Sequence, residues 1–324
     1  MRIVFMGTPE FAVPSLEALL RSEDQVVGVV SQPDRPKGRG YELAPSPVKL
    51  LCLRERLPIL QPLKMKEPVF LDALKAWQPE LITVAAFGRI LPKVVLDLPP
   101  RGCVNVHASL LPKYRGAGPI QWAIIKGERE TGITTILMDE GMDTGAILLQ
   151  ERLAIHPDET AGELSARLAE VGGRLLVETI RRLKEGALAP RAQDHTQATM
   201  APLLKKDDGW ITWTAEASEI VNRVRGLSPW PGAFTYAGDE RWIIWRAAIK
   251  DRAWEGKGPA PTPGTLVEAG KDGILVVTGH GLLVILDLQP ANNRRMTAAQ
   301  YVAGHSLSPG LVLGAAGQPE RRQD

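Results

Sequence analysis

An asparagine and a histidine lie two residues apart in the stretch Cys-Val-Asn-Val-His at 103–107. Valines alternate with them, and side chains along a strand alternate between its two faces, so we expect Asn105 and His107 on one face of a strand. An amide N–H can donate to an oxyanion that develops during a reaction. An imidazole can donate or accept a proton near neutral pH. The pair is a candidate for catalysis, although an isolated Asn-x-His is more often two satisfied polar residues at the end of a sheet.

A third candidate, Asp143, lies in the glycine-flanked stretch DEGMDTG at 139–145, after another strand-like run. The carboxyl ends of neighbouring strands in an open parallel sheet share one crevice, so we expect Asp143 beside Asn105 and His107. A carboxylate there can orient the imidazole and favour its protonated form. A nucleophile is missing, since Ser109 has no G-x-S-x-G motif around it. The set suits direct attack of one substrate on another through a tetrahedral intermediate, as in acyl or formyl transfer to an amine.

A basic, proline-rich stretch at 32–49 (QPDRPKGRGYELAPSPVK) is the next candidate for binding. Its prolines and glycines argue against a helix or a central strand and predict an exposed, semi-rigid loop. It carries Arg35, Lys37, Arg39 and Lys49. Because it follows the second predicted strand, we expect it over the same crevice, where its cations could contact phosphate groups. The plain alternative is a solvated loop.

Short buried-type strands alternate with helices through the first two-thirds of the chain, which predicts a mostly parallel sheet. The predicted strands are 2–7, 25–32, 81–88, 103–109 and 132–139. The strongest helix is predicted over 160–185, with a capping box between Thr160 and Glu163. Residues 187–207 show no clear period and indicate a linker.

The C-terminal part has short, glycine-punctuated strands, which indicate a small barrel or sandwich. The runs are 241–248, 264–270, 273–279 and 281–288. Small barrels often bind nucleic acid, and basic residues are available here at Lys205, Lys206, Arg223, Arg225, Arg294 and Arg295. The whole chain carries 39 Lys and Arg against 37 Asp and Glu, so charge alone leaves nucleic-acid binding undecided.

Composition excludes several classes of function. The length of 324 residues suits two domains. Cys52 and Cys103 lie far apart without a CxxC pattern, which argues for a reducing compartment and against a disulfide framework or a zinc site. The histidine spacing offers no metal motif, and no apolar run approaches a membrane span of about 20 residues. The stretch MGTPEFA lacks G-x-G-x-x-G, so nothing indicates a nicotinamide or flavin cofactor.

Taken together, these stretches resemble the methionyl-tRNA formyltransferase family over nearly the whole chain. The matching motifs, in order, are MGTPEFAVPSLEALL, SQPDRPKGRG…APSPVK, FGRILP, NVHASLLPKYRGAGPIQWAIIKGE and DEGMDTG. The Asn-x-His and Ser-Leu-Leu-Pro core is shared by folate-dependent formyltransferases at large, including those that act on glycinamide ribonucleotide and amino sugars. The PDRPKGRG loop and the C-terminal barrel point to tRNA. The chain departs from the family pattern at Phe87, Trp122, Leu203 and Thr212.

The resemblance implies an α/β fold in two parts. A doubly wound, mostly parallel, Rossmann-like catalytic domain would cover 1–188, followed by a linker at 189–207. A smaller OB-like β-barrel that binds tRNA would cover 208–316, and 317–324 would be a disordered tail. The implied reaction moves a formyl group from 10-formyltetrahydrofolate to the methionine α-amino group of initiator methionyl-tRNA, leaving tetrahydrofolate. We further expect a cytoplasmic, bacterial-type monomer that needs no metal and no membrane.

The resemblance also implies roles for single residues. Asn105, His107 and Asp143 would be catalytic. The folate pocket would be lined by Phe87, Gly88, Ile90, Leu91, Ser109, Leu110, Leu111 and Pro112, and tRNA would be contacted by Arg35, Lys37, Arg39 and Lys206. Two alternatives remain open: a formyltransferase for an amino-sugar nucleotide, and a nucleic-acid-binding protein whose N-terminal domain is catalytically dead.

Overall fold

The computed structural model of this chain describes residues 1–37, 42–250 and 261–315. Contacts between residues divide the chain into two units. The first unit comprises Met1–Pro119, Glu130–Ala154 and Leu164–Pro202, and the second comprises Ile120–Arg129, Ile155–Glu163 and Leu203–Asp324. The stretches 120–129 and 155–163 thus join the second unit, which the sequence did not indicate. The predicted boundaries 1–188, 189–207 and 208–316 stay predictions, and the predicted tail at 317–324 lies outside the described residues.

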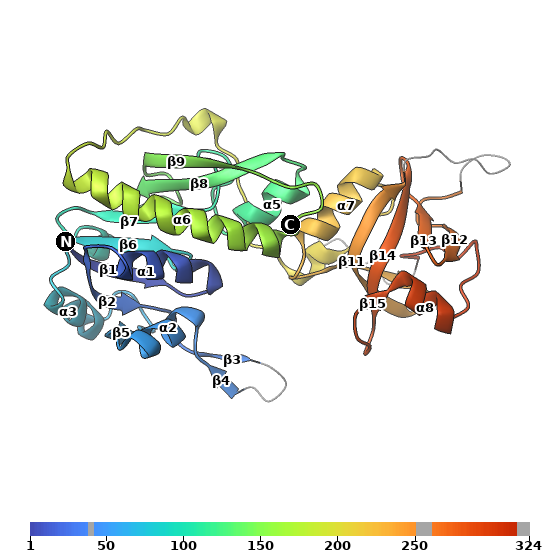
Figure 1. The fold of residues 1–324 in the computed structure, drawn as a ribbon, viewed down its shortest axis with the longest axis horizontal. Coiled ribbons are helices and arrows are strands. Elements are labelled where there is room, and N and C mark those ends of the chain that lie inside the picture. The colour runs from blue at the N-terminus through green and yellow to red at the C-terminus, as the bar shows by residue number, and fades with distance from the viewer. Residues whose placement is uncertain (38–41, 251–260, 316–324) are drawn as a thin grey trace. The chain divides into compact units, whose positions relative to one another are not determined.

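The first unit is built on a seven-stranded sheet in the order β5-β2-β1-β6-β7-β8-β9 (Figure 1). The strands are β1 (Arg2–Gly7), β2 (Gln25–Val30), β5 (Ile59–Leu60), β6 (Leu81–Ala85), β7 (Cys103–His107), β8 (Glu130–Leu137) and β9 (Ala146–Ala154). Neighbours from β5 to β7 pair in parallel, whereas β8 is antiparallel to both β7 and β9. The mostly parallel α/β sheet is therefore confirmed.

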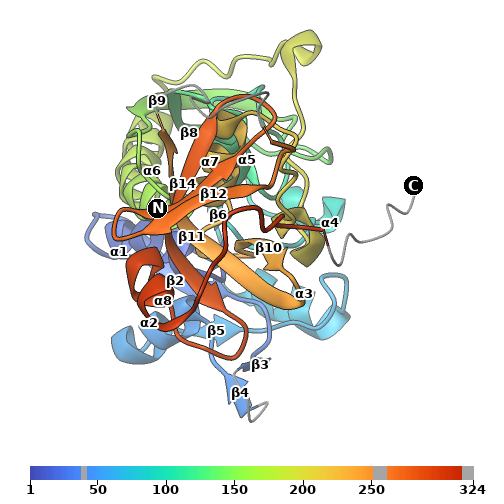
Figure 2. The same ribbon diagram turned by 90° about the vertical axis from the view of Figure 1, so that its right-hand side faces the viewer.

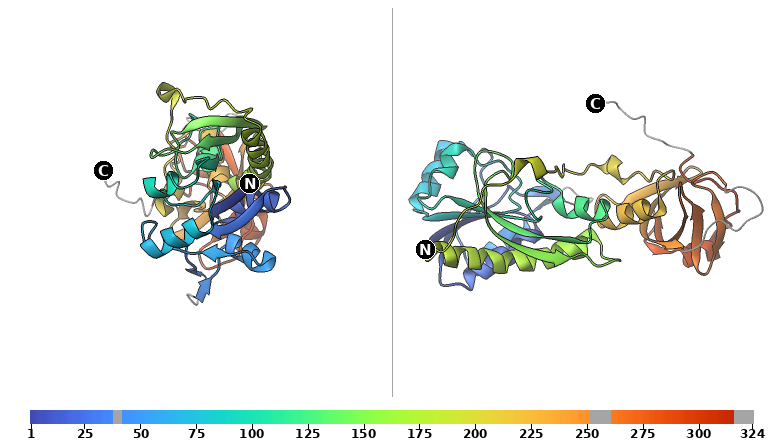
Figure 3. Two further views of the ribbon diagram at one scale, coloured as in Figure 1. Left: turned by 90° about the vertical axis from the view of Figure 1, so that its left-hand side faces the viewer. Right: turned by 90° about the horizontal axis from the view of Figure 1, so that it is seen from above.

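Helices cover both faces of this sheet, as buried parallel strands require. They are α1 (Val13–Leu20), α2 (Pro47–Glu55), α3 (Pro68–Ala76), α4 (Lys93–Leu96) and α6 (Ala161–Lys184). Helix α6 begins as predicted: Glu163 N–H donates to Thr160 Oγ1, and Thr160 N–H donates to the Glu163 carboxylate. Helices α1 and α6 lie side by side (Figures 1 and 3). They approach so closely that a Cβ on Gly173 of α6 would stand 2.8 Å from the carbonyl oxygen of Pro14 in α1.

The two faces of β7 have different neighbours. Val106 points toward α6, where a Cβ on Gly172 would meet its methyl group at 2.9 Å. Cys103 points the other way and belongs to the core under α3 and α4, together with Leu74 and Val95. By the alternation of a strand, Asn105 and His107 share the face of Cys103. The site therefore opens on the side of the sheet opposite α6.

The basic stretch at 32–49 differs from the predicted loop. It contains a short hairpin of β3 (Arg35–Lys37) and β4 (Glu42–Ala44), whose register pairs Arg35 with Ala44. It then enters α2, which begins at Pro47 with Ser46 Oγ accepting from Lys49 N–H. Proline is excluded from central strands but tolerated at sheet edges. Pro36 can therefore lie in β3, because β3 and β4 form a two-stranded sheet separate from the main sheet.

The second unit holds an antiparallel sheet in the order β10-β11-β14-β13-β12, with β15 paired to β14. Figure 2 shows β10, β11, β12 and β14 of this sheet. Its strands are β10 (Ala233–Ala237), β11 (Glu240–Lys250), β12 (Leu266–Gly270), β13 (Gly273–Val277), β14 (Leu282–Pro290) and β15 (Met296–Thr297). The stretch 311–314 bonds to both edge strands: Leu266 N–H donates to Leu311 O, and Gly314 N–H donates to Tyr236 O. This bridging of the edges fits the barrel-like domain that was predicted.

The described residues of the second unit also form the α-helices α5 (Pro119–Ile125), α7 (Ala217–Gly226) and α8 (Ala298–Gly304). Helices α5 and α7 touch where a Cβ on Gly226 would lie 2.6 Å from Ile125 Cγ1. Trp122 of α5 packs on the core of this unit. Trp213 and Trp242 are buried there as well, so they pack in the core and offer no exposed surface for stacking bases.

Candidate active site

Strand β7 presents Asn105 and His107 as the sequence predicted. Asn105 is half-buried in the middle of the strand, paired with Val84 of β6 and Ile136 of β8. His107 is the last residue of the strand and is 5% exposed. Both side chains rise from one face of a strand that is hydrogen-bonded on both sides. Their positions are therefore fixed by the central part of the sheet.

Asp143 approaches both residues, but by a different route from the one predicted. Strand β8 runs antiparallel to β7, so its last residue, Leu137, pairs with Val104 near the start of β7. The loop after β8 has to return toward the end of β7. It brings Asp143 Oδ1 to 3.5 Å from Asn105 Nδ2 and 3.6 Å from His107 Nδ1. Asn105, His107 and Asp143 therefore lie together as predicted. The reason differs from the predicted one, because β7 and β8 are antiparallel and their carboxyl ends do not meet at the same edge of the sheet.

The loop after β7 contacts the same groups. Tyr114 O lies 2.9 Å from His107 Nε2, and because a carbonyl oxygen only accepts, Nε2 carries the hydrogen of this bond. Gly116 N–H donates to Asp143 Oδ2 at 2.9 Å. His107 Nδ1 thus faces the carboxylate, and a proton on this nitrogen would create an ion pair between His107 and Asp143. The arrangement can hold an imidazolium between two acceptors while an amide N–H stands nearby.

A second cluster behind Asp143 was missed from the sequence. Gln193 donates from Nε2 to the carbonyl oxygens of Asp143 and Gly145, at 2.8 Å each. Its Oε1 accepts from Arg115 Nε at 3.1 Å and from Nη2 at 2.6 Å, and the same Nη2 lies 3.1 Å from His195 Nδ1. Gln193 lies in the stretch predicted as a linker, where the absence of a period gave no signal for a buried polar residue.

The residues of the predicted folate pocket have mixed exposure. Phe87, Leu91, Ser109 and Leu111 are buried, while Ile90 is 77% exposed. Gly88 has a φ of +72°, and a Cβ there would meet Gln32 Nε2 at 2.6 Å, so this turn requires glycine.

Leu110 and Pro112 stand partly exposed on either side of the buried Leu111. Leu111 forms a small core with Ile136 and Ile147, and its N–H donates to Thr134 Oγ1. The buried members of the set shape their loops, so a ligand could reach Ile90 and the backbone more readily than the side chains of Phe87 or Leu111.

A hydrogen-bonded network joins the hairpin to the loop at 87–88. Gln32 donates to Phe87 O at 2.8 Å, and its Oε1 accepts from the guanidinium of the exposed Arg35. Asp34 accepts from Gln61 at 2.8 Å and from Lys49 at 2.6 Å, and these bonds hold the pKa of its carboxyl below the usual range. The base of the basic hairpin is therefore tied directly to the predicted folate loop.

The remaining residues predicted to contact tRNA are placed less completely. Lys206 is exposed at the start of the short 3₁₀ helix η3 (Lys206–Gly209). Lys37 ends β3, and Arg39 lies outside the described residues. Arg35 and Lys37 belong to the first unit and Lys206 belongs to the second, so the four tRNA contacts Arg35, Lys37, Arg39 and Lys206 stay a prediction.

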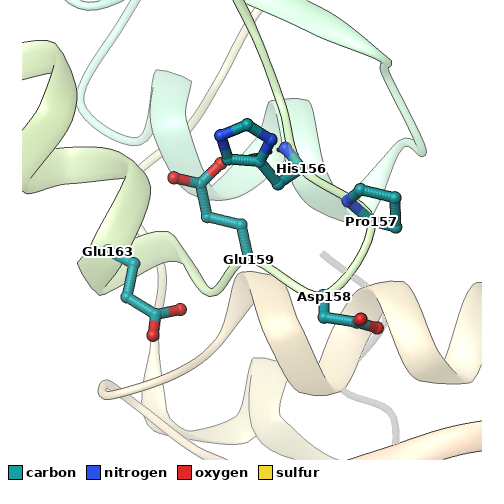
Figure 4. A pocket seen from close by; sticks show the side chains of 5 residues that line it. All are labelled: His156, Pro157, Asp158, Glu159 and Glu163. Carbon is teal, nitrogen blue, oxygen red and sulfur yellow. Dashed lines mark hydrogen bonds between the residues drawn. The ribbon is translucent and has the colours of Figure 1, made fainter.

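An open pocket of the second unit is lined by different residues. Figure 4 shows His156, Pro157, Asp158 and Glu159 from the stretch before α6, with Glu163 from its first turn. Three of the five lining residues are acidic, so the pocket suits neither the carboxylates of a folate nor a phosphate backbone. None of the predicted site residues lines it.

The described residues show neither a group of metal ligands nor a membrane-spanning helix. Within residues 1–37, 42–250 and 261–315, no three His, Cys, Asp or Glu side chains are grouped so that they could hold a metal ion. Over the same described ranges, no helix combines the length and apolar character needed to cross a membrane.

Known proteins resemble the chain over both units. Residues 1–180 match the family described as formyl transferase, and residues 203–306 match the formyl transferase C-terminal domain. A protein named methionyl-tRNA formyltransferase from Desulfotalea psychrophila is 50% identical over 313 residues, which are 97% of this chain and 95% of that protein.

Two solved structures share the fold. The methionyl-tRNA formyltransferase from Clostridium thermocellum aligns over 78% of this chain and 94% of its own, with a TM-score of 0.54 at 21% identity. HypX from Aquifex aeolicus, in complex with tetrahydrofolic acid, aligns over 93% of this chain and 47% of its own, with a TM-score of 0.60 at 17% identity.

Proposed function

This chain belongs to the methionyl-tRNA formyltransferase family, and from that premise we propose that Asn105, His107 and Asp143 carry out its formyl transfer. The reaction joins the formyl group of a folate donor to the methionine amine of initiator methionyl-tRNA. The donor we propose is 10-formyltetrahydrofolate, which leaves as tetrahydrofolate. That the enzyme acts as a cytoplasmic monomer without a metal stays a prediction.

The chemistry requires a neutral amine and a place for one proton. An α-amino group has a pKa of about 8, so a neutral fraction exists at physiological pH. Its lone pair attacks the formyl carbon, and a C–N bond forms while the carbonyl electrons move to oxygen. The bond from the formyl carbon to the folate nitrogen then breaks. The proton lost by the amine ends on that nitrogen, so no nucleophilic side chain is needed.

Each of the three residues has a role that its contacts support. Asn105 donates its amide N–H to the oxyanion of the intermediate, where charge develops. His107 carries a hydrogen on Nε2 already, so Nδ1 is the nitrogen that takes the amine proton and returns it to the leaving nitrogen. Asp143 stabilises the imidazolium from 3.6 Å. The observation that carries the proposal is this convergence of Asn105 and His107 on one carboxylate oxygen.

The substrate contacts are the second part of the proposal. The loop at 87–91 and the Ser-Leu-Leu-Pro segment at 109–112 would hold the folate, with Ile90 exposed for contact. Cations at Arg35, Lys37, Arg39 and Lys206 would contact the tRNA. We further propose that the catalytic domain covers 1–188 and the tRNA-binding domain covers 208–316, with a linker at 189–207 between them.

A label-transfer experiment tests the proposal. The purified chain is mixed with 10-formyltetrahydrofolate labelled in the formyl group and with either methionyl initiator tRNA or an amino-sugar nucleotide. We expect label on the tRNA alone. Transfer to the sugar alone would contradict the assignment of tRNA as the acceptor. If a folded sample transfers label to neither acceptor, the result would favour the alternative hypothesis of a nucleic-acid-binding protein whose N-terminal domain is catalytically dead.

Two variants test the residues themselves. We expect Asn105→Ala to lower kcat about 10²–10³-fold, because an oxyanion donor is lost. His107→Ala should lower kcat about 10²–10⁴-fold through the loss of an acid–base group. Circular dichroism and the unfolding temperature serve as controls for the fold. Rates near wild type for either folded variant would remove that residue from the mechanism.

A further inference from the structure

Gln193 connects two loops of the site through one buried side chain. It is 6% exposed and uses both ends of its amide. The NH₂ group donates to the carbonyl oxygens of Asp143 and Gly145, and the oxygen accepts twice from Arg115. Arg115 is itself 7% exposed. The side chain therefore links the loop before β9 to the loop after β7.

The loop before β9 needs such a support because its backbone is strained. Asp143 has a φ of +53°, a left-handed conformation that is unfavourable for most residues other than glycine. Such conformations persist where the surroundings hold them, and they gather at functional sites. The two hydrogen bonds from Gln193 hold the carbonyls of Asp143 and Gly145 on either side of Thr144. They act on the segment of backbone that aims the Asp143 carboxylate.

The loop after β7 is held by the same side chain at Arg115. On one side of Arg115, Tyr114 O accepts from His107 Nε2, and on the other side Gly116 N–H donates to Asp143 Oδ2. A displacement of this loop would therefore move the partners of both His107 and Asp143. The contacts of Asp143 Oδ1 with Asn105 and His107 are long, 3.5 and 3.6 Å, so their strength depends on small displacements.

The fold does not depend on this side chain alone. Arg115 N–H donates to Thr199 O, Ala201 N–H donates to Arg115 O, and Gly118 N–H donates to Ala201 O. Arg191 and Ile147 exchange two further backbone hydrogen bonds. We expect these bonds to keep the stretch 191–201 on the first unit when the Gln193 amide is removed, so that a loss of activity can be separated from a loss of structure.

We propose that Gln193 is a positioning residue for formyl transfer: it holds the backbone of Asp143 so that the carboxylate stays aimed at His107 and Asn105. The proposal deepens the assignment of Asp143 made above and rests on it. Gln193 touches neither substrate in this mechanism. Its effect should fall on kcat, with the KM values for the folate donor and the tRNA unchanged.

The decisive variant is Gln193→Glu. A carboxylate there keeps both acceptor bonds to Arg115, yet has no N–H for the carbonyls of Asp143 and Gly145. We expect kcat to fall about 10–100-fold, as for other residues that orient a catalytic group. Gln193→Ala should lose a similar factor. The control is Gln197→Ala, which removes an exposed glutamine from the same stretch and should keep wild-type kcat.

A double-mutant cycle distinguishes positioning from a merely structural role. In an Asp143→Asn background, Gln193→Glu should change the single-turnover rate by no more than about twofold, because the carboxylate that Gln193 positions has already been removed. The same 10–100-fold loss in that background would overturn the proposal, and so would wild-type kcat or a raised KM in the single variant. Wild-type kcat for Asp143→Asn would instead overturn the role of Asp143, and the positioning role would fail with it.

Discussion

One carboxylate oxygen organises the proposed site at the scale of residues. Asp143 Oδ1 faces Nδ1 of His107, while a backbone carbonyl fixes the hydrogen on Nε2. The imidazole can therefore gain a proton only on the side of the carboxylate, where the resulting charge is balanced. In the proposed mechanism, Asp143 balances the charge of a protonated His107, and Asn105 donates to the oxyanion.

The two cysteines have no part in this chemistry, and burial explains why. Burial raises the pKa of Cys103 from 9.0 to about 12 and that of Cys52 to about 11. Since the thiolate is the reactive form, both should resist iodoacetamide at pH 8 in the folded protein and react once the protein is unfolded. Mass spectrometry of the alkylated chain measures this. If either thiol in the folded protein is labelled at the rate of a free thiol, the conclusion that burial raises its pKa would be contradicted.

The same pKa shifts predict how stability depends on pH. Above pH 9 the thiols ionise in the unfolded chain before they do so in the folded one. The folded state then binds more protons, so the contribution of these thiols to stability falls as pH rises from 9 toward 12. Cys103→Ala should therefore show a shallower loss of stability over this range than the wild type, measured by urea unfolding at each pH.

Single residues also show where sequence reasoning reached its limit. Asn105 and His107 could be placed on one face because alternation along a strand is local. Gln193 and Arg115 could not be paired, because their contact joins residues 78 positions apart and neither stretch has a period. Their burial depends on backbone bonds that form only when the chain folds back on itself.

At the scale of elements, the close approach of α6 to α1 supports the strand that carries the site. A Cβ on Gly173 would lie 2.8 Å from Pro14 O, which is backbone and has little freedom to move. In an ordinary helix, alanine is better than glycine by about 1 kcal/mol. Overpacking costs about 1–3 kcal/mol, and the gain in helix propensity offsets about 1 kcal/mol of it, so we expect Gly173→Ala to lower the free energy of unfolding by about 0–2 kcal/mol.

Urea unfolding measures this difference. The matched control is Glu170→Ala, which changes an exposed position on the same helix and should stay within about 0.5 kcal/mol of the wild type. A Gly173→Ala variant that is more stable than the wild type would show that α1 and α6 do not pack this closely.

Elements differ in how far the sequence could predict them. Strands β1, β2, β6, β7 and β8 and helix α6 have strong local patterns, and each lies where it was expected. The direction of β8 was wrong, because pattern alone carries no information on strand direction. The hairpin at β3 and β4 was missed for a related reason: Arg35, Pro36 and Leu43 are exposed, so these short strands leave no pattern of buried residues in the sequence. The stretch 120–129 joined the second unit because Trp122 and Ile125 pack there, a contact that sequence distance conceals.

At the scale of the whole molecule, the net charge of +2 is too small to attract a polyanion at long range. Affinity for tRNA must then come from local phosphate contacts, which release counterions. If Arg35, Lys37, Arg39 and Lys206 each neutralise one phosphate, the plot of log affinity against log salt should have a slope of about −3 to −4. Filter binding of methionyl-tRNA between about 50 and 200 mM salt measures the slope.

Removal of one cation separates local contacts from a general charge effect. Lys206→Ala should weaken binding and make the slope shallower by about 1, because one phosphate contact is lost. Lys75→Ala removes the same charge from an exposed position on α3, which holds none of the predicted contacts, and should leave the slope unchanged. Equal changes in both variants would mean that overall charge governs the affinity. A slope near zero in the wild type would mean that the chain holds its tRNA by contacts other than phosphate.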